Sequence, residues 1–450
     1  MNNLLTFNRL MALQLLIIIT SSFINLGLTR NADYYLERWS KKNVAPDHKI
    51  SPIVSEASLV TSTPKLLLSA PVADTATSSN IIGSSSNSSL STGFPNGTEN
   101  RNSRFFPLFS LITIQNTACT ATGGDNGTCY TANQCKNLGG SASGTCQQGL
   151  GTCCVFQTTC GGQATQNCTY FVNEGYPTVF NAASSCQLRV NKMNSSVCQL
   201  RIDFDTFILS TPDSVDHQCL NDRFYVSGGT SVPVICGTNS GNHMYVDIGN
   251  TLPLVLTVIT MGPSFDRKWK MKITQIPCNS DNTAPTNCLQ WYQGVSGQIK
   301  SFNYDLTSGL QLSNQDYSIC IRTEMNFCGI QYAACADAVN TQSQSFTLSG
   351  RTTGGTRVGS KVGATSCPFD WLLIPCVSTN SQKPFTSCQE RLCGDNFNVV
   401  ESTTAGNVIV YSQVKPFVLV YHTDDREQTS VPTESNNRGF CLNYVQQPCV

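Results

Sequence analysis

The amino-acid sequence predicts an all-β protein, in which two antiparallel β-sandwiches follow a small disulfide-rich module. Three observations carry this prediction. The 450-residue chain contains 23 cysteines, and in an oxidising compartment that many thiols become crosslinks. Short apolar runs with the strand period of two follow residue 160, as in Leu200-Arg-Ile-Asp-Phe-Asp-Thr-Phe207. Turn residues separate these runs, and no convincing helical pattern lies between residues 160 and 276.

Charge and histidine content exclude two function classes. Lys+Arg and Asp+Glu each number 28, and only 12% of the residues are charged. No Lys/Arg-rich run is visible, so nucleic acid is not an expected partner. Zinc sites are the alternative use for the cysteines, but they usually show short CxxC and HxxxH pairs. The histidines are far apart and lack cysteines at ligand spacing: His48, His217, His243 and His422.

The first 30 residues are typical of a signal peptide. Arg9 precedes an apolar run from about Leu10 to Leu28. A membrane anchor is the alternative, although polar residues such as Asn25 make the run marginal for a span. We therefore expect a secreted protein with no membrane span once the signal is removed. N-glycosylation acceptors agree with secretion, and they are Asn87, Asn96, Asn126, Asn167 and Asn194.

Residues 31–104 are expected to form a disordered leader. They contain no cysteine and become rich in Ser, Thr, Asn and Pro, a composition that buries too little apolar surface to offset chain entropy. The leader ends at Arg101-Asn-Ser-Arg104, and an Arg-x-x-Arg in such a stretch resembles a proprotein-convertase site. Two chance arginines in a linker are the alternative interpretation.

Residues 105–159 are expected to form a small cysteine-rich module. Below about 70 residues a core alone is rarely sufficient, so disulfides are expected to staple this segment. Its cysteine spacing, with Gly151-Thr-Cys-Cys-Val155, resembles the clip modules of arthropod extracellular proteases. The resemblance implies three pairs, although the residues alone leave other connectivities open. The implied pairs are Cys119–Cys153, Cys129–Cys146 and Cys135–Cys154.

Residues 160–277 resemble a CUB domain. The segments that carry the resemblance are Cys160-Gly-Gly162, Phe171-Val-Asn-Glu-Gly-Tyr-Pro177, Cys186-Gln-Leu-Arg-Val190, Cys219-Leu-Asn-Asp222 and Ile235-Cys-Gly237. The resemblance implies a jelly-roll-like sandwich with the bridges Cys160–Cys186 and Cys219–Cys236. Cys168 and Cys198 then remain, and we expect them to form an extra pair.

Residues 278–450 look like a diverged second CUB domain with insertions. Cys288-Leu-Gln-Trp-Tyr-Gln-Gly294 is similar to a CUB opening, and Gly439-Phe-Cys-Leu-Asn-Tyr444 resembles the closing strand. The whole arrangement resembles secreted arthropod proteins with paired CUB-like domains and no protease domain. If the earlier cysteines all pair, eleven remain from Cys278 onward. One of them would then be free, bridge domains or link two chains, so a disulfide-linked dimer is a hypothesis.

The sequence predicts no catalysis and no cofactor. It contains no Gly-Asp-Ser-Gly-Gly, HExxH, GxSxG or P-loop pattern. Calcium is the remaining candidate, because many CUB domains bind it through acidic side chains. Asp222 matches one of the three expected carboxylates. Ser210 stands at the Glu position, and the later loop Thr260-Met-Gly-Pro263 carries no Asp, so Asp222 is a weak calcium candidate.

These features predict a non-catalytic, secreted protein that recognises extracellular proteins or glycans through CUB-type modules. Rigid sandwiches present loops and faces for recognition. Two alternatives remain open: a structural component of an extracellular matrix or cuticle, and a non-catalytic regulator of an extracellular protease cascade.

Overall fold

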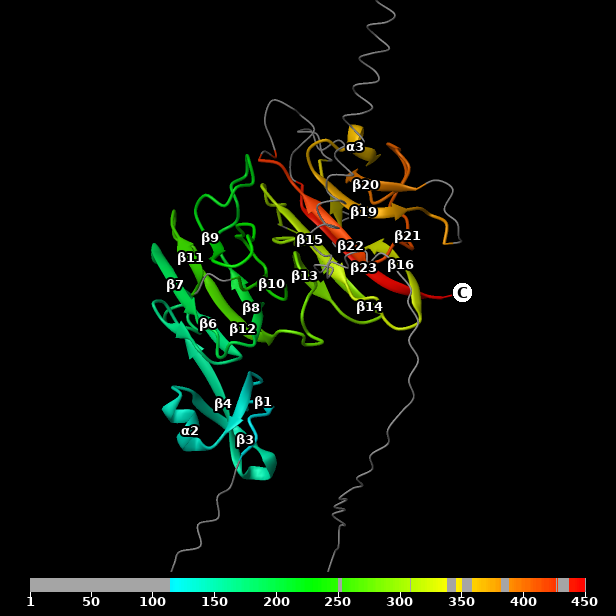
Figure 1. Ribbon diagram of the computed structural model, residues 1–450. Coiled ribbons are helices and arrows are strands. Elements are labelled where there is room, and N and C mark those ends of the chain that lie inside the picture. The colour runs from blue at the N-terminus through cyan, green and yellow to red at the C-terminus, as the bar shows by residue number, and fades with distance from the viewer. Residues whose placement is uncertain are drawn as a thin grey trace, which may run out of the picture. The chain divides into compact units, whose positions relative to one another are not determined.

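The computed structural model describes residues 114–449, apart from residues 250–252, 308, 338–344, 350–357, 382–387, 426 and 428–436. The expected signal peptide, the leader, Asn87, Asn96, Arg101 and Arg104 lie outside the described residues. The described chain is all-β with a few short helices, and its strands form two sandwiches preceded by a small module (Figure 1). No helix in this part of the chain is long and apolar enough to cross a membrane.

The cysteine-rich module is a small sheet with one helix packed against it. Its strands are β1 (Ala118–Thr120), β2 (Asn126–Tyr130), β3 (Ser141–Cys146) and β4 (Gly151–Thr158). The helix α2 (Ala132–Asn137) begins after Thr131, which forms a reciprocal capping box with Gln134. A 3-10 turn, η1 (Gln147–Gly149), precedes β4. Strand β4 then pairs in parallel with β6 (Thr169–Val172), so the module is hydrogen-bonded to the first sandwich.

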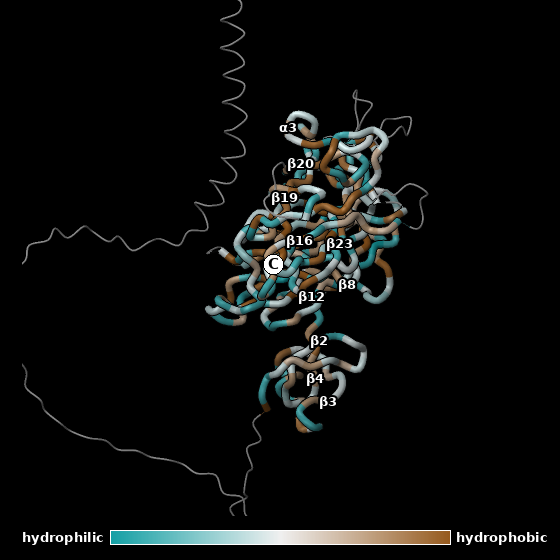
Figure 2. Tube along the Cα trace, turned by 90° about the vertical axis from the view of Figure 1, so that its right-hand side faces the viewer, coloured by the Kyte–Doolittle hydropathy of each residue, from teal (hydrophilic) through white to brown (hydrophobic). Residues whose placement is uncertain are grey.

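The first sandwich encloses an apolar core between two sheets. In β12 (Lys268–Pro277) Trp269, Met271 and Ile273 are buried while the lysines between them are not, as the two-residue period requires. Figure 2 shows the same interleaving of apolar and polar residues along the strands. The orders are β6-β12-β8-β10 and β5-β7-β11-β9. The remaining bounds are β5 (Gln163–Ala164), β7 (Ser184–Val190), β8 (Val197–Ile208), β9 (Arg223–Ser227), β10 (His243–Asp247) and β11 (Leu254–Thr260).

The second sandwich is larger, as the expected insertions require. One sheet has the order β13-β15-β22-β19-β20-β18 and the other β14-β23-β16-β21, with β17 also paired to β23. The bounds are β13 (Cys288–Tyr292), β14 (Ser296–Lys300), β15 (Asp316–Ile321), β16 (Phe327–Ala334), β17 (Phe346–Thr347), β18 (Ser360–Val362), α3 (Gly363–Ser366), β19 (Trp371–Val377), β20 (Gln389–Gly394), β21 (Val410–Ser412), β22 (Phe417–His422) and β23 (Gly439–Pro448).

The two sandwiches share one buried core. Phe204 of the first and Phe302 of the second meet edge to face, with ring centroids 6.4 Å apart. Asn303 accepts a hydrogen bond from the Thr238 backbone N–H (2.9 Å). Gly237 has a φ of +72°, and a Cβ there would lie 2.0 Å from the Asn303 side-chain oxygen, so only glycine fits this approach. The junction is therefore a packed, desolvated interface.

Eleven disulfides crosslink the chain. Five of them join the pairs that the clip and CUB resemblances imply: Cys119–Cys153, Cys129–Cys146, Cys135–Cys154, Cys160–Cys186 and Cys219–Cys236. Five lie in the second sandwich: Cys288–Cys320, Cys328–Cys449, Cys335–Cys441, Cys367–Cys393 and Cys376–Cys388.

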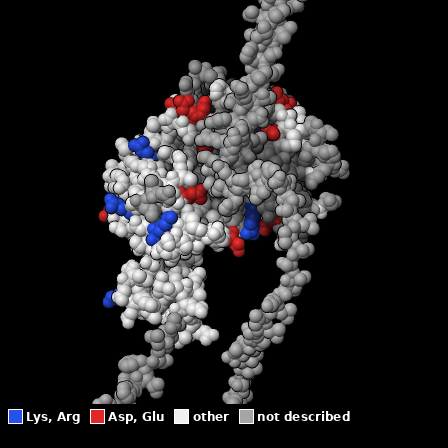
Figure 3. All heavy atoms as spheres, in the orientation of Figure 1, with Lys and Arg blue, Asp and Glu red and all other residues white. Residues whose placement is uncertain are grey.

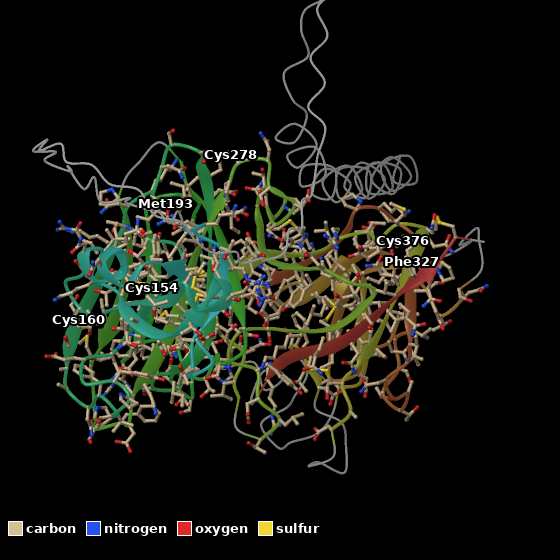
Figure 4. All side chains as sticks on the ribbon, turned by 90° about the horizontal axis from the view of Figure 1, so that it is seen from below. Cys154, Cys160, Met193, Cys278, Phe327 and Cys376 are labelled. Atoms are coloured by element: carbon tan, nitrogen blue, oxygen red, sulfur yellow. A yellow bond between two sulfur atoms is a disulfide. The ribbon has the colours of Figure 1, made fainter. Side chains whose placement is uncertain are left out.

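The expected Cys168–Cys198 pair is wrong. Cys198 is bonded to Cys278 instead, and Cys168 is the free cysteine. The cause is strand register: β12 pairs with β8 so that Pro277 lies opposite Val197, which brings Cys278 beside Cys198. Figure 4 labels Cys278. The odd cysteine therefore lies in the first sandwich and not in the segment from Cys278 onward.

A free thiol at Cys168 has a measurable consequence. Its side chain is half-buried, and burial raises the pKa of the thiol, so little thiolate forms at neutral pH. We expect the unreduced, denatured protein to take up one alkylating group per chain, at Cys168, as read by peptide mass spectrometry. Cys168→Ser should take up none. An unreduced dimer that Cys168→Ser abolishes would instead assign this cysteine to an interchain bridge.

Candidate functional site: the loop end of the first sandwich

Three loops meet at one end of the first sandwich. They are the β6–β7 loop (173–183), the β8–β9 loop (209–222) and the β11–β12 loop (261–267). Strand pairing places them together, because Thr260 lies opposite Ser184 and Lys268 lies opposite Ile208. We call this region the loop end.

A buried ion pair joins two of these loops. The Arg267 Nε atom lies 2.7 Å from one Asp222 oxygen, and a terminal guanidinium nitrogen lies 2.9 Å from the other. Both residues are only 1% exposed. The geometry is the bidentate fork that arginine forms with a carboxylate, and such charge-assisted bonds are among the stronger ones in proteins.

Every other polar contact around this pair comes from the backbone. The Ser210 and Met261 N–H groups donate to the Asp222 carboxylate at 2.7 and 3.1 Å. The Arg267 guanidinium donates in turn to the Met261 carbonyl oxygen at 2.6 Å. Because the buried charged groups of this network all have hydrogen-bond partners, the network fixes the loops in one arrangement.

This network explains why Asp222, the weak calcium candidate, lacks the other carboxylates of a calcium site. Asp222 does hold a cation, but the cation is the guanidinium of Arg267 from the later loop. Ser210, at the expected Glu position, contributes a backbone N–H donor where a metal would need an oxygen ligand. Among the residues that the structure describes, no group of three or more His, Cys, Asp or Glu side chains is arranged to hold a metal ion.

The β6–β7 loop is fastened to the same network. Phe180 forms a backbone bridge with Arg267, and the Asn181 side chain binds Ser264 and the Phe265 backbone N–H. All three loops are thus joined by hydrogen bonds, although their connections are far apart in the sequence.

The loop end exposes apolar side chains from each of the three loops. Val179 is 43% exposed, Leu220 57% and Met261 47%, and Val215 in the β8–β9 loop is half exposed. Single exposed apolar residues are ordinary on protein surfaces. Their presence on three fastened loops at one end is the feature that suggests an interaction surface.

The second sandwich repeats part of this arrangement. Asp370 follows Cys367 by three residues, as Asp222 follows Cys219. Its buried carboxylate accepts hydrogen bonds from the Ser349 hydroxyl (2.8 Å), the Asp424 N–H (3.0 Å) and the Gln311 amide (3.1 Å). Burial raises the pKa of Asp370 to about 6. Asp370 was not among the candidates predicted from the sequence, although its Cys-x-x-Asp spacing from Cys367 could have revealed it.

The β8–β9 loop also contacts the second sandwich. The Ser313 N–H donates to the His217 carbonyl oxygen (3.2 Å), and the Gln218 amide donates to the Asp425 carbonyl oxygen (3.0 Å). His217 is buried, with Nδ1 3.7 Å from a Glu427 oxygen, and burial lowers the pKa of its imidazole to about 4. The position of the loop end is therefore coupled to the interface between the sandwiches.

The remaining candidate residues lie apart from the loop end. Asn126 and Asn194 are exposed, as glycosylation acceptors must be. Asn167 is half-buried, and its side-chain oxygen accepts the Gln275 N–H at 2.8 Å. His243 is buried in β10 against Trp291, a core position.

Comparison with known proteins agrees with this architecture. Residues 285–447 match the family model of the animal CUB domain. The chain contains a CUB domain. The matched segment is the one that the sequence analysis described as a diverged copy, and it coincides with the second sandwich. No curated protein matches the chain.

Solved structures with similar folds include the CUB1-EGF-CUB2 domains of rat MASP-1, at 12% identity and a TM-score of 0.22, covering 64% of this chain and 99% of that one. The human MASP-1/3 CUB1-EGF-CUB2 domain is 12% identical with a TM-score of 0.21, and the match covers 62% of this chain and 98% of that one. The full extracellular region of zebrafish Gpr126/Adgrg6 is 15% identical with a TM-score of 0.23, and the match covers 63% of this chain and 36% of that one.

Proposed function

We propose that this chain is a non-catalytic, secreted binding protein that recognises another extracellular protein through the loop end, without calcium. The observation that carries the proposal is the Arg267–Asp222 pair. It fixes two loops in place with an internal cation, and the β6–β7 loop is hydrogen-bonded to them. Together these loops present Val179, Leu220 and Met261 to solvent. CUB domains are typically extracellular protein-binding modules, and eleven disulfides suit an oxidising compartment.

Rigid loops favour this kind of recognition. A surface that is already ordered loses less conformational entropy on binding, so more of the contact energy appears as affinity. Exposed Leu and Met side chains supply the apolar area that becomes buried at the centre of an interface. Catalysis has no support from the sequence motifs, and the buried side chains of Asp222 and Arg267 are occupied in holding the loops.

The test is a crosslinking capture from the native extracellular fluid, with and without a calcium chelator, followed by mass spectrometry. We expect the same partner under both conditions. Met261→Asp should weaken its binding by about tenfold or more, because a charge replaces an apolar contact at the interface. Met325→Asp is the matched control, since Met325 is exposed on the second sandwich.

Four results would contradict the proposal or redirect it. Loss of the partner in chelator would show that a metal is needed after all. Equal loss in the Met261 and Met325 variants would remove the loop end as the binding surface. Recovery of proteases or their inhibitors would favour the cascade-regulator alternative, and recovery of matrix glycoproteins would favour adhesion.

A further inference from the structure

The outer face of the β5-β7-β11-β9 sheet has an unusual charge pattern. In β7 the residues Cys186, Leu188 and Val190 are buried in the core, so the alternate residues point outward. In β9, Phe224 and Val226 are buried in the same way. We call the surface formed by the outward residues the outer face. Its members are Ser185, Gln187, Arg189, Val255, Ile259, Arg223, Tyr225 and Ser227, and Thr257 is buried beneath them.

Strand register arranges these side chains as an array of three rows. Ile259 lies between Ser185 and Arg223 in the first row. In the third row, Val255 lies between Arg189 and Ser227. The two arginines therefore occupy diagonal corners, about 16 Å apart from the spacing of residues and strands.

Neither arginine has a carboxylate partner among the residues that the structure describes. The four strands of this sheet contain no Asp or Glu. The Arg223 Nε atom is buried and has no hydrogen-bond partner. An unpaired donor of this kind is costly unless a ligand or water meets it.

The other sheet of the same sandwich is the internal comparison. Three of its cations have carboxylate partners: Lys270 pairs with Asp125, Lys272 lies 3.4 Å from Asp203, and Arg201 lies 2.7 Å from Asp203. The fourth, Lys268, lies over the ring of Tyr176. The chain has balanced charge and few charged residues, whereas the strands of this sheet carry two arginines and no carboxylate. Figure 3 shows Lys and Arg as a few separate patches on the surface it draws.

We propose that the outer face binds a sulfated polysaccharide. Arginine matches the geometry of sulfate, with two parallel N–H donors for each anionic group. Between the arginines, Gln187, Tyr225 and Ser185 offer amide and hydroxyl groups to sugar hydroxyls. Val255 and Ile259 are only partly exposed, so the face lacks the large apolar anchor at the centre of most protein interfaces. This inference goes beyond the proposed function, because it adds a glycan ligand at a second surface.

The experiment measures binding of the full secreted chain to immobilised heparin, with desulfated heparin and polyglutamate as comparison probes. We expect binding to heparin at low salt, weakened by added salt because the contact is electrostatic. Arg189→Gln/Arg223→Gln should weaken it by about tenfold or more. Lys136→Gln/Lys415→Gln removes two exposed charges elsewhere and should change it by less than about twofold.

The outcomes separate this inference from the proposed function. Met261→Asp should leave heparin binding intact, because Met261 belongs to the loop end. Absence of heparin binding at low salt would overturn the inference while leaving the loop end untouched, and so would an equal loss in the two double variants. Binding to polyglutamate as strong as to heparin would assign the outer face to acidic proteins. Thermal unfolding of each variant checks that the fold is retained.

Discussion

Arg267→Ala is expected to destabilise the protein by about 3–5 kcal/mol. The substitution leaves the Asp222 carboxylate buried without its cation, and the neighbouring Met261 carbonyl loses a donor. A buried charge without a partner is far more costly than the pair is stabilising. The measurement is the free energy of unfolding in urea with the disulfides intact.

The control is the double variant Arg267→Ala/Asp222→Asn. It removes the orphaned charge and leaves one amide oxygen to accept a hydrogen bond from Ser210 or Met261. We therefore expect it to be more stable than Arg267→Ala alone, although the added Asp222→Asn change removes a second native group. Added calcium should rescue neither variant. If calcium restored the stability of Arg267→Ala, the guanidinium would be standing at a site that can still take a metal.

Much of the architecture follows from local patterns in the sequence. The two-residue period of segments such as Leu200–Phe207 determines which side chains face the core, and that period is visible without a structure. The cysteine spacings of the cysteine-rich module and of the first sandwich match those of known domains whose disulfides join residues close in the sequence. Asp222 was also found, because its spacing from Cys219 is local.

Long-range partners were not visible in the same way. Cys198 and Cys278 are 80 residues apart and meet only because β8 and β12 pair over their full length. Cys168 precedes β6, which pairs with β12 and not with β8. Sequence spacing cannot show whether Cys168 or Cys278 is the partner of Cys198, whereas the order of the strands does.

The cation beside Asp222 was missed for a related reason. A calcium-binding CUB domain would carry an acidic residue in the β11–β12 loop, and Arg267 at the end of this loop has the opposite charge. The interface between the sandwiches is still harder to foresee. It depends on Asn303 and Asn239, polar loop residues that normally predict turns at a solvent-exposed surface.

Acidification from pH 7 to pH 5 is expected to weaken the interface between the two sandwiches. His217 and His243 are both buried there, and burial lowers the pKa of each imidazole to about 4. His243 Nε2 lies 3.0 Å from the Trp291 carbonyl oxygen, across the junction. Asp213 and Glu427 face His217, while Arg201 and Asp203 lie near His243.

The sign follows from proton counting. An unfolded histidine has a pKa of about 6.5, so between pH 6.5 and 4 the unfolded chain holds protons that the folded chain excludes. Stability contributed by neutral, buried histidines is therefore present at pH 7 and is lost as pH falls through this window. Asp370 acts oppositely, because its raised pKa of about 6 means that the folded chain holds the extra proton between pH 6 and 4.

Two histidines outweigh one carboxyl group, so the net effect is a loss of stability on the order of 2–3 kcal/mol by pH 5. His243→Gln keeps a hydrogen-bonding group beside Trp291 without a titrating one, and it should remove about 2 kcal/mol of the difference in unfolding free energy between pH 7 and pH 5. Asp370→Asn should have the reverse effect and enlarge that difference, since it removes the opposing group. A pH dependence unchanged by both substitutions would show that the interface remains closed in acid and that surface carboxylates control the acid response.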